Sequence, residues 1–278
     1  MNSGTTAGEF GSRETLHRLW TFFKNQAMLL EEVQSLMKGS EDPVALAVLT
    51  LLYAATDTNK SIALLAREEK MRDTYVLART SYETMLNACF ILTEGEEAAD
   101  RAYRHALQKA WRDLHRELPI NDTTVYIRHS AQIDPDEDSA LRDAIDEFTS
   151  KRGREITSWT PAPLRKRIEK VGLKYGNRVT KGLQFGLLAI YRHASDISHG
   201  TVFGSMYAVG LTDASGPPKS PSELQQRQRE NLCMLLTLLG GVVDSLLHVL
   251  GQYLGVEDFV ERSERAVASL GQEPWIQT

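Results

Sequence analysis

Apolar residues recur at helical spacing along most of the chain. Between residues 13 and 38, for example, Leu16, Leu19, Phe23 and Met28 fall on one face of a helix, and Gly39 ends the run. Similar periods, bounded by Gly, Pro or a capping residue, predict helices at 13–38, 43–70, 71–94, 96–118, 135–151, 161–176, 179–199, 222–255 and 257–270. The sequence therefore predicts an all-α protein, built as a multi-helix bundle.

The segments between these helices predict how the chain is organised. Residues 121–132, 153–163 and 211–221 lack a period and predict loops, and a weak strand-like alternation occurs only at 202–210. We expect one helical domain over 13–270, with 119–160 as an inserted loop and acidic helix. Residues 1–12 are polar and rich in glycine, resemble translated cloning sites and predict no targeting peptide, while 271–278 predict a tail.

The longest apolar stretch favours a core helix over a membrane span. Residues 232–254 approach spanning length but contain Asp244, Ser245, His248 and Gln252, which are costly in lipid. The two cysteines, Cys89 and Cys233, lie in apolar helical runs, so no disulfide framework is predicted. These features predict a cytoplasmic protein with no membrane partner.

Charge is segregated along the chain although its formal net value is only −5. Residues 151–181 hold ten Lys and Arg against two acids, a local balance of +8, whereas 134–147 hold seven acids against one Arg, a local balance of −6. The positively charged segment predicts phosphate contacts that do not depend on base sequence. Its candidate nucleic-acid-binding residues are Arg165, Lys166, Arg167, Lys170 and Lys174.

The strongest chemical constellation lies at 191–200. Arg192 and His199 are seven residues apart, close to two helical turns, and Ser195 lies between them on the same face. Arginine holds anionic oxygens in a planar fork and histidine titrates near neutrality, so this trio could bind a phosphate and move a proton. The same spacing is also typical of a solvated helix face that ends in a histidine C-cap.

This pattern is an arginine, the polar residue His193, five more residues and then His199. It resembles the R-x(4–6)-H motif of the HEPN superfamily of helical proteins. The resemblance implies a metal-independent ribonuclease that acts as a homodimer, binds RNA and needs no cofactor. It implies that His199 is the general acid or base and that Arg192 stabilises charge on the phosphorane. Ser195 or His193 would orient the scissile phosphate.

A second resemblance covers more of the chain, from about residue 71 to 207. Arg79 with Glu83 matches an R-x-x-x-E helix, and Ser195 with His199 and Gly200 matches an S-x-x-x-H-G helix. Both are shared by a prokaryotic all-helical family catalogued only as a domain of unknown function. The additional positions that support this resemblance are Asn87, Trp159 and Tyr191. Asp196, beside the serine, is a further supporting residue of the candidate site.

Two polar sets leave alternatives open. Arg79, Glu83 and Asn87 repeat every four residues, which fits an exposed stripe or a buried polar network equally well. Asp244 and His248 are also four apart and predict a buried histidine bonded to a carboxylate rather than a metal site.

Three functions are compatible with the sequence. The leading prediction is a HEPN-like ribonuclease or RNA-binding protein of a prokaryotic defence or toxin system. The rival is a non-catalytic helical protein that binds a partner or self-assembles, with the polar residues as a structural network. A metal-dependent enzyme using Glu83, His199, Asp244 and His248 is least favoured, because that spacing matches no familiar ligand set.

Overall fold

The computed structural model describes residues 10–126 and 134–271. Predictions for 1–9, 127–133 and 272–278 lie outside the described residues. The described chain is dominated by helices and contains one two-stranded sheet, which confirms the all-α prediction. It divides into two compact units: unit 1 comprises Met1–Thr93 with Leu164–Thr278, and unit 2 comprises Glu94–Pro163.

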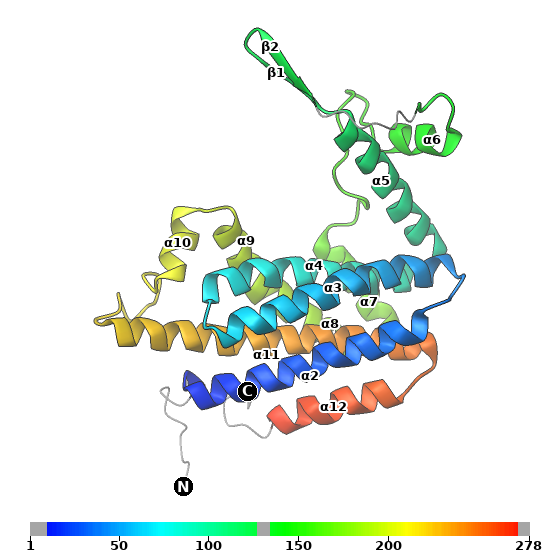
Figure 1. Cartoon of the computed structure of the whole chain (residues 1–278). Coiled ribbons are helices and arrows are strands. Elements are labelled where there is room, and N and C mark those ends of the chain that lie inside the picture. Colours follow the sequence, from blue (N-terminus) through cyan, green and yellow to red (C-terminus); the bar gives the residue numbers. More distant parts are fainter. Residues whose placement is uncertain (1–9, 127–133, 272–278) are drawn as a thin grey trace. The chain divides into compact units, whose positions relative to one another are not determined.

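Unit 1 is a helical bundle (Figure 1). Its helices are α2 (Arg13–Met37), α3 (Pro43–Arg67), α4 (Met71–Glu94), α7 (Leu164–Tyr175), α8 (Asn177–Phe185), the π-helical segment η1 (Gly186–Tyr191), α9 (Arg192–Ser198), α10 (Val202–Ala208), α11 (Pro221–Leu254) and α12 (Asp258–Gly271).

Side-chain caps fix where the long helices begin. The Asp42 carboxylate accepts hydrogen bonds from the backbone N–H groups of Val44 and Ala45, and proline occupies the first position of α3. Helix α11 begins two residues earlier than its predicted capping box: the hydroxyl of Ser220, rather than Ser222, accepts from the backbone of Glu223. The predicted type of cap, a serine hydroxyl, is correct, but the capping serine lies two residues earlier in the sequence.

Helix α11 is the central element of the core. It packs against α2, α8 and α12, and α2 also packs against α3 (Figure 1). By length and composition α11 could cross a membrane, but 72% of its most apolar 18-residue stretch is buried inside the protein. The predicted core helix is therefore confirmed.

The predicted helix 179–199 is helical throughout but changes type in its middle, where η1 connects α8 to α9. Gly186 is the reason this segment can lie against α4, because a Cβ there would come within 2.5 Å of the Tyr82 ring. The weak strand predicted at 202–210 is wrong, since Val202–Ala208 forms α10 with Thr201 as its N-cap. Gly204 lets α10 approach the backbone of Asp196.

Unit 2 contains α5 (Glu96–Leu114), a hairpin of β1 (Glu117–Ile120) and β2 (Thr123–Tyr126), and α6 (Ser139–Glu147). The strands are antiparallel, with Glu117 opposite Tyr126. The hairpin replaces the end of the predicted helix 96–118 and the start of the predicted loop 121–132. The compact unit also begins at Glu94, well before the predicted insertion 119–160.

Two acids of unit 2, one in the acidic segment 134–147 and one in the positively charged segment that follows it, pair with the positive face of α5. Glu147 accepts charge-assisted contacts from Arg101 and Arg104, at 2.6 and 2.7 Å, and Glu155 pairs with Lys109 at 2.7 Å. Helix α6 is shorter than predicted because Asp138, rather than Asp134, caps it. Opposite charges that are separated along the sequence are thus paired in space within this unit.

One predicted pair in α11 is not formed. Asp244 is buried, and its carboxylate accepts two hydrogen bonds from Arg178, at 2.8 and 3.0 Å, and one from Ser263 at 2.6 Å. His248 instead contacts the side chain of Gln252 at 2.8 Å. The Asp244–His248 hydrogen bond was a wrong prediction, because arginine satisfies both carboxylate oxygens in a fork that one imidazole cannot match.

Candidate functional site

Arg79 lies at the edge of α4, between buried and exposed faces. Its neighbours Ala78 and Tyr82 are fully buried, whereas Thr80 is exposed. This position leaves the Arg79 side chain 21% exposed, with its guanidinium at the protein surface. The predicted ion pair with Glu83 is present at 3.9 Å, one turn further along α4.

Three polar groups of α9 and its C-cap lie close to one nitrogen of Arg79. Its Nη1 lies 3.3 Å from the hydroxyl of Ser195, 3.2 Å from the hydroxyl of Ser198 and 3.4 Å from Nε2 of His199. The R-x-x-x-E helix and the S-x-x-x-H-G helix therefore meet at Arg79. We call Arg79, Tyr191, Ser195, Ser198 and His199 the Arg79 cluster.

Tyr191, the last residue of η1, completes the Arg79 cluster. Its hydroxyl accepts a hydrogen bond from Nη2 of Arg79 at 3.4 Å, and the guanidinium lies 4.8 Å from the centre of its ring. Behind it, buried Tyr82 donates its hydroxyl to the carbonyl of Leu183 at 3.0 Å, and burial raises the pKa of Tyr82. The aromatic pair therefore holds the guanidinium from one side against a rigid support.

Asn87 and Arg167 extend the polar line of α4 away from the Arg79 cluster. Arg167 donates from Nη1 to the side-chain carbonyl of Asn87 at 2.7 Å. Burial lowers the pKa of Arg167, and the nearby charge of Glu83 acts in the opposite direction. Of the two interpretations of this stripe, the polar network holds for Asn87, which buried Arg167 contacts, and the surface stripe holds for Glu83, whose side chain is 39% exposed.

Arg192 and His199 are both exposed, as on a solvated helix face. His199 ends α9 as its C-cap, and Gly200 follows in the left-handed region at φ 63°, which turns the chain away. The imidazole therefore lies at a helix end, open to solvent, beside the guanidinium of Arg79.

His193 does not occupy the position expected for a phosphate-orienting residue. Its ring stacks on Tyr207 of α10, with centroids 4.8 Å apart and planes 11° apart, and Tyr207 in turn contacts Tyr75. Burial, followed by the positive charge of Arg192, lowers the pKa of His193. Asp196 contributes its backbone carbonyl, which accepts from Thr201.

The predicted nucleic-acid contacts on α7 divide into two groups. Arg167 is 9% exposed and bonded to Asn87, and Lys174, although exposed, donates to the carbonyls of Leu92 and Thr93. Arg165, Lys166 and Lys170 are also exposed, and Lys166 pairs with Glu169 at 2.7 Å. The second group remains a prediction for phosphate contact.

The described residues hold no group of three or more His, Cys, Asp or Glu side chains arranged for a metal ion. The ligand set considered from sequence is divided among other partners, since Asp244 binds Arg178 and Glu83 pairs with Arg79. Among the described residues these four side chains therefore do not form one ligand set.

Sequence reasoning missed the part of Ser198 in the Arg79 cluster. Its hydroxyl lies closer to Nη1 of Arg79 than that of Ser195, and it donates to the Ser195 carbonyl at 3.0 Å. A signal was present, because Ser198 is three residues after Ser195 and therefore on an adjacent face of the same helix.

Comparison with known proteins gives one match. The model of a family described as "Family of unknown function (DUF5677)" matches residues 45–216, which include the R-x-x-x-E and S-x-x-x-H-G helices. No curated protein and no solved structure matches the chain. The resemblance to an uncharacterised all-helical family is thereby confirmed.

Proposed function

Because the chain belongs to the DUF5677 family, whose description assigns no reaction, we propose a function from its own side chains: the Arg79 cluster binds the phosphodiester of RNA and cleaves it. The observation that carries this proposal is the convergence of two hydroxyls and an imidazole, within 3.2–3.4 Å, on one nitrogen of an arginine at an open surface. A cation, hydroxyl groups and a titratable ring are the groups that phosphate binding and proton transfer require.

The hydrogen-bonding chemistry favours His199 as a general base. A guanidinium carries only donors, so the imidazole nitrogen that faces Arg79 must be the acceptor. In that tautomer Nε2 keeps its lone pair and can take a proton. An approaching RNA phosphate would draw Arg79 toward its oxygens and free the imidazole to accept the proton of the 2′-hydroxyl.

The proposed step balances without a further reactant. The 2′-oxygen loses its proton to His199 and forms a bond to phosphorus, while the bond from phosphorus to the 5′-oxygen breaks. The leaving 5′-oxygen takes a proton from water, since the site is open. Arg79 and exposed Arg192 stabilise the negative charge on the phosphorane, and the products carry a 2′,3′-cyclic phosphate and a 5′-hydroxyl.

Exposed positive charge on α7 supports RNA as the substrate. Arg165, Lys166 and Lys170 lie on the surface of unit 1, in a chain whose overall charge is negative. Such side chains bind any phosphate backbone. Each contact with a phosphate of single-stranded RNA makes the slope of log K against log salt concentration steeper by about 0.7. The assembly as a homodimer in a prokaryotic defence or toxin system stays part of this proposal.

The test is incubation of the purified protein with total RNA and tRNA in EDTA. We expect fragments ending in 2′,3′-cyclic phosphate, and no cleavage of DNA of the same sequence. His199→Ala and Arg192→Ala should each reduce the rate by roughly 10²-fold or more, with nearly unchanged melting temperature, because exposed polar substitutions alter stability by about 0.5 kcal/mol or less. Arg72→Ala, at an exposed position of α4 outside the cluster, is the matched control.

The rival function is a non-catalytic interaction or self-assembly protein, and one observation favours it. Arg79 already donates to protein groups on α9 and is only 21% exposed, as in a structural network. In that case truncation leaves the part-buried hydroxyls of Ser195 and Tyr191 without this donor, at about 1–3 kcal/mol. A melting temperature several degrees lower in Arg79→Ala and His199→Ala, with no cleavage by the parent protein in any salt or divalent ion, would assign the cluster to the scaffold.

A further inference from the structure

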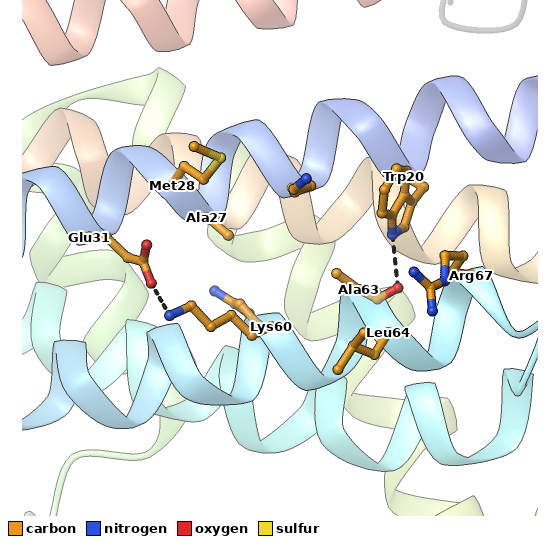
Figure 2. Close-up of a pocket in the computed structure, with 10 residues that line it drawn as sticks. Trp20, Ala27, Met28, Glu31, Lys60, Ala63, Leu64 and Arg67 are labelled. Carbon is orange, nitrogen blue, oxygen red and sulfur yellow. Dashed lines mark hydrogen bonds and ion pairs between the residues drawn. The ribbon is translucent and has the colours of Figure 1, made fainter.

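Unit 1 contains a cavity of about 460 Å³ between α2 and α3. This volume lies within the range of about 300–1,000 Å³ typical of small-molecule sites. Figure 2 shows that its labelled walls come from these two helices only. The cavity is therefore separate from the Arg79 cluster, which α4, η1 and α9 build.

Specific contacts fix the ends of this cavity. At one end, Lys60 of α3 forms an ion pair with Glu31 of α2 (Figure 2). At the other, the indole N–H of Trp20 donates to the carbonyl of Ala63 at 2.8 Å and holds the ring as a wall near Arg67. Lys60 and Arg67 are seven residues apart on α3, so the cavity extends about 10 Å along the helix.

The lining combines an apolar body with excess positive charge. Trp20, Ala27, Met28, Ala63 and Leu64 supply the apolar surface. The charged lining residues are three cations, Lys24, Lys60 and Arg67, and one acid, Glu31, a balance of +2. Outside the lining, Arg67 also forms an exposed ion pair with Glu68 at 3.1 Å. A molecule with an apolar body and a negative group would complement this lining, whereas the chain as a whole has a net charge of −5.

Asn59 gives an independent indication of a ligand. It lines the cavity, is 0% exposed, and its side-chain carbonyl accepts from Ser81 at 2.6 Å. Its Nδ2 has no hydrogen-bond partner among the described residues. A buried amide donor without a partner is costly, so a ligand acceptor that meets it would add to binding.

We propose that the cavity between α2 and α3 binds an amphipathic monocarboxylate. The carboxylate lies at the Trp20 end, near Arg67 and Lys24, whose ammonium group is 5.4 Å from the Trp20 ring. The apolar body extends along Ala63 and Ala27 toward the Lys60–Glu31 pair. Because Asn59 lies beside Lys60, its buried amide would meet a second acceptor on the ligand, remote from the carboxylate; decanoate carries only the carboxylate and the apolar chain, and it tests those two contacts.

The test uses decanoate as the probe and decyltrimethylammonium as its counterpart with the same apolar chain and opposite charge. Isothermal titration calorimetry on the full chain should show one molecule of decanoate bound, with a dissociation constant at least tenfold lower than that of the cation. Arg67→Gln should weaken decanoate binding by about tenfold, equivalent to about 1.4 kcal/mol, and leave the cation unaffected. Arg72→Gln, exposed on α4 and outside the cavity, should bind like the parent protein.

A second variant tests the place of binding. Ala27→Leu adds carbon atoms to the cavity from α2 and should abolish decanoate binding, with melting temperature as the check that the protein folds. Equal affinity for decanoate and decyltrimethylammonium, no binding of decanoate, or undiminished binding by Arg67→Gln and Ala27→Leu would each overturn the proposal. RNA cleavage is not part of this readout, so either proposal can fail alone.

Discussion

Unit 1 buries Phe23, Tyr75 and Tyr82 in a core that several long helices share, whereas unit 2 buries Phe148 and Leu141 beneath a layer of ion pairs. Burial of a large apolar side chain contributes about 1.5–3 kcal/mol, and a surface ion pair contributes about 0–1 kcal/mol. The contrast indicates that packing stabilises the part of the chain with the Arg79 cluster, and that charge has a larger share in unit 2.

The largest effect is expected from Phe23→Ala. Phe23 is fully buried in unit 1, and its truncation should lower the free energy of unfolding by about 3–5 kcal/mol through lost burial and a residual cavity. Urea denaturation followed by circular dichroism measures it. Phe185→Ala is the matched control, since Phe185 is 56% exposed, and it should cost about 0.5 kcal/mol or less. Equal losses in the two variants would contradict the burial assigned to Phe23.

Phe148→Ala should produce a more local effect, near the lower end of the same range at about 3 kcal/mol. Phe148 is fully buried within unit 2. The centre of its ring lies 4.8 Å from the centre of the His105 ring, which it meets edge-on, and 5.2 Å from the guanidinium carbon of Arg101. Hydrogen exchange should become faster in α5 and α6 and stay slow in α11. Faster exchange throughout α11 would show that the two units unfold together.

The ion pairs of unit 2 can be tested with Glu147→Gln. This change removes the carboxylate that holds both Arg101 and Arg104, and we expect a loss of about 1 kcal/mol. The loss should shrink as salt is raised, because ions screen exposed charges. Glu117→Gln, at an exposed position of β1, is the control. A loss of stability that does not change with salt would mean that Glu147 stabilises unit 2 through packing and not through its charge.

The smallest effect near neutrality should come from two histidines, one in each unit. Burial lowers the pKa of His105 and of His193, and the positive charges of Lys109 and Arg192, respectively, act in the same direction. Each group then binds its proton more weakly in the folded state, so stability falls as pH drops below the ordinary value of about 6.5. His105→Gln should flatten this fall in unit 2 and His193→Gln in unit 1, measured by hydrogen exchange at pH 7.5 and 5.5. A steeper fall in either variant would reverse the sign assigned here.

The same contrast explains what could be predicted from sequence. Helices α2, α3 and α4 were predicted closely because each has a sustained apolar period and a clear start or stop, such as Asp42 with Pro43. Unit 2 was predicted poorly because the hairpin strands have four exposed residues each, so no alternation of burial marks them. Short polar elements leave no period for the sequence to display.

For the candidate site, spacing placed Arg79 with Glu83, and Ser195 with His199, on their helices. The family resemblance named both helices, and the structure shows that they meet at Arg79. Position along one helix could not reveal that His193 stacks on Tyr207, or that Arg167 is buried against Asn87. Those contacts depend on which helix lies opposite, and no single-helix pattern contains that information.

The π-helical segment η1 has a consequence for how the Arg79 cluster could have arisen. A π turn closes its hydrogen bonds over one more residue than an α turn, so η1 behaves as an α-helix with one inserted residue. One residue corresponds to about 100° of rotation about the axis of an α-helix, and the wider π turn absorbs that rotation, so α9 keeps the face that meets Arg79. Deleting one residue from η1 should therefore restore a continuous α-helix and leave Ser195 and His199 facing α4. Family members that keep Arg79, Ser195 and His199 can accordingly have one residue fewer between the positions of Gly186 and Arg192.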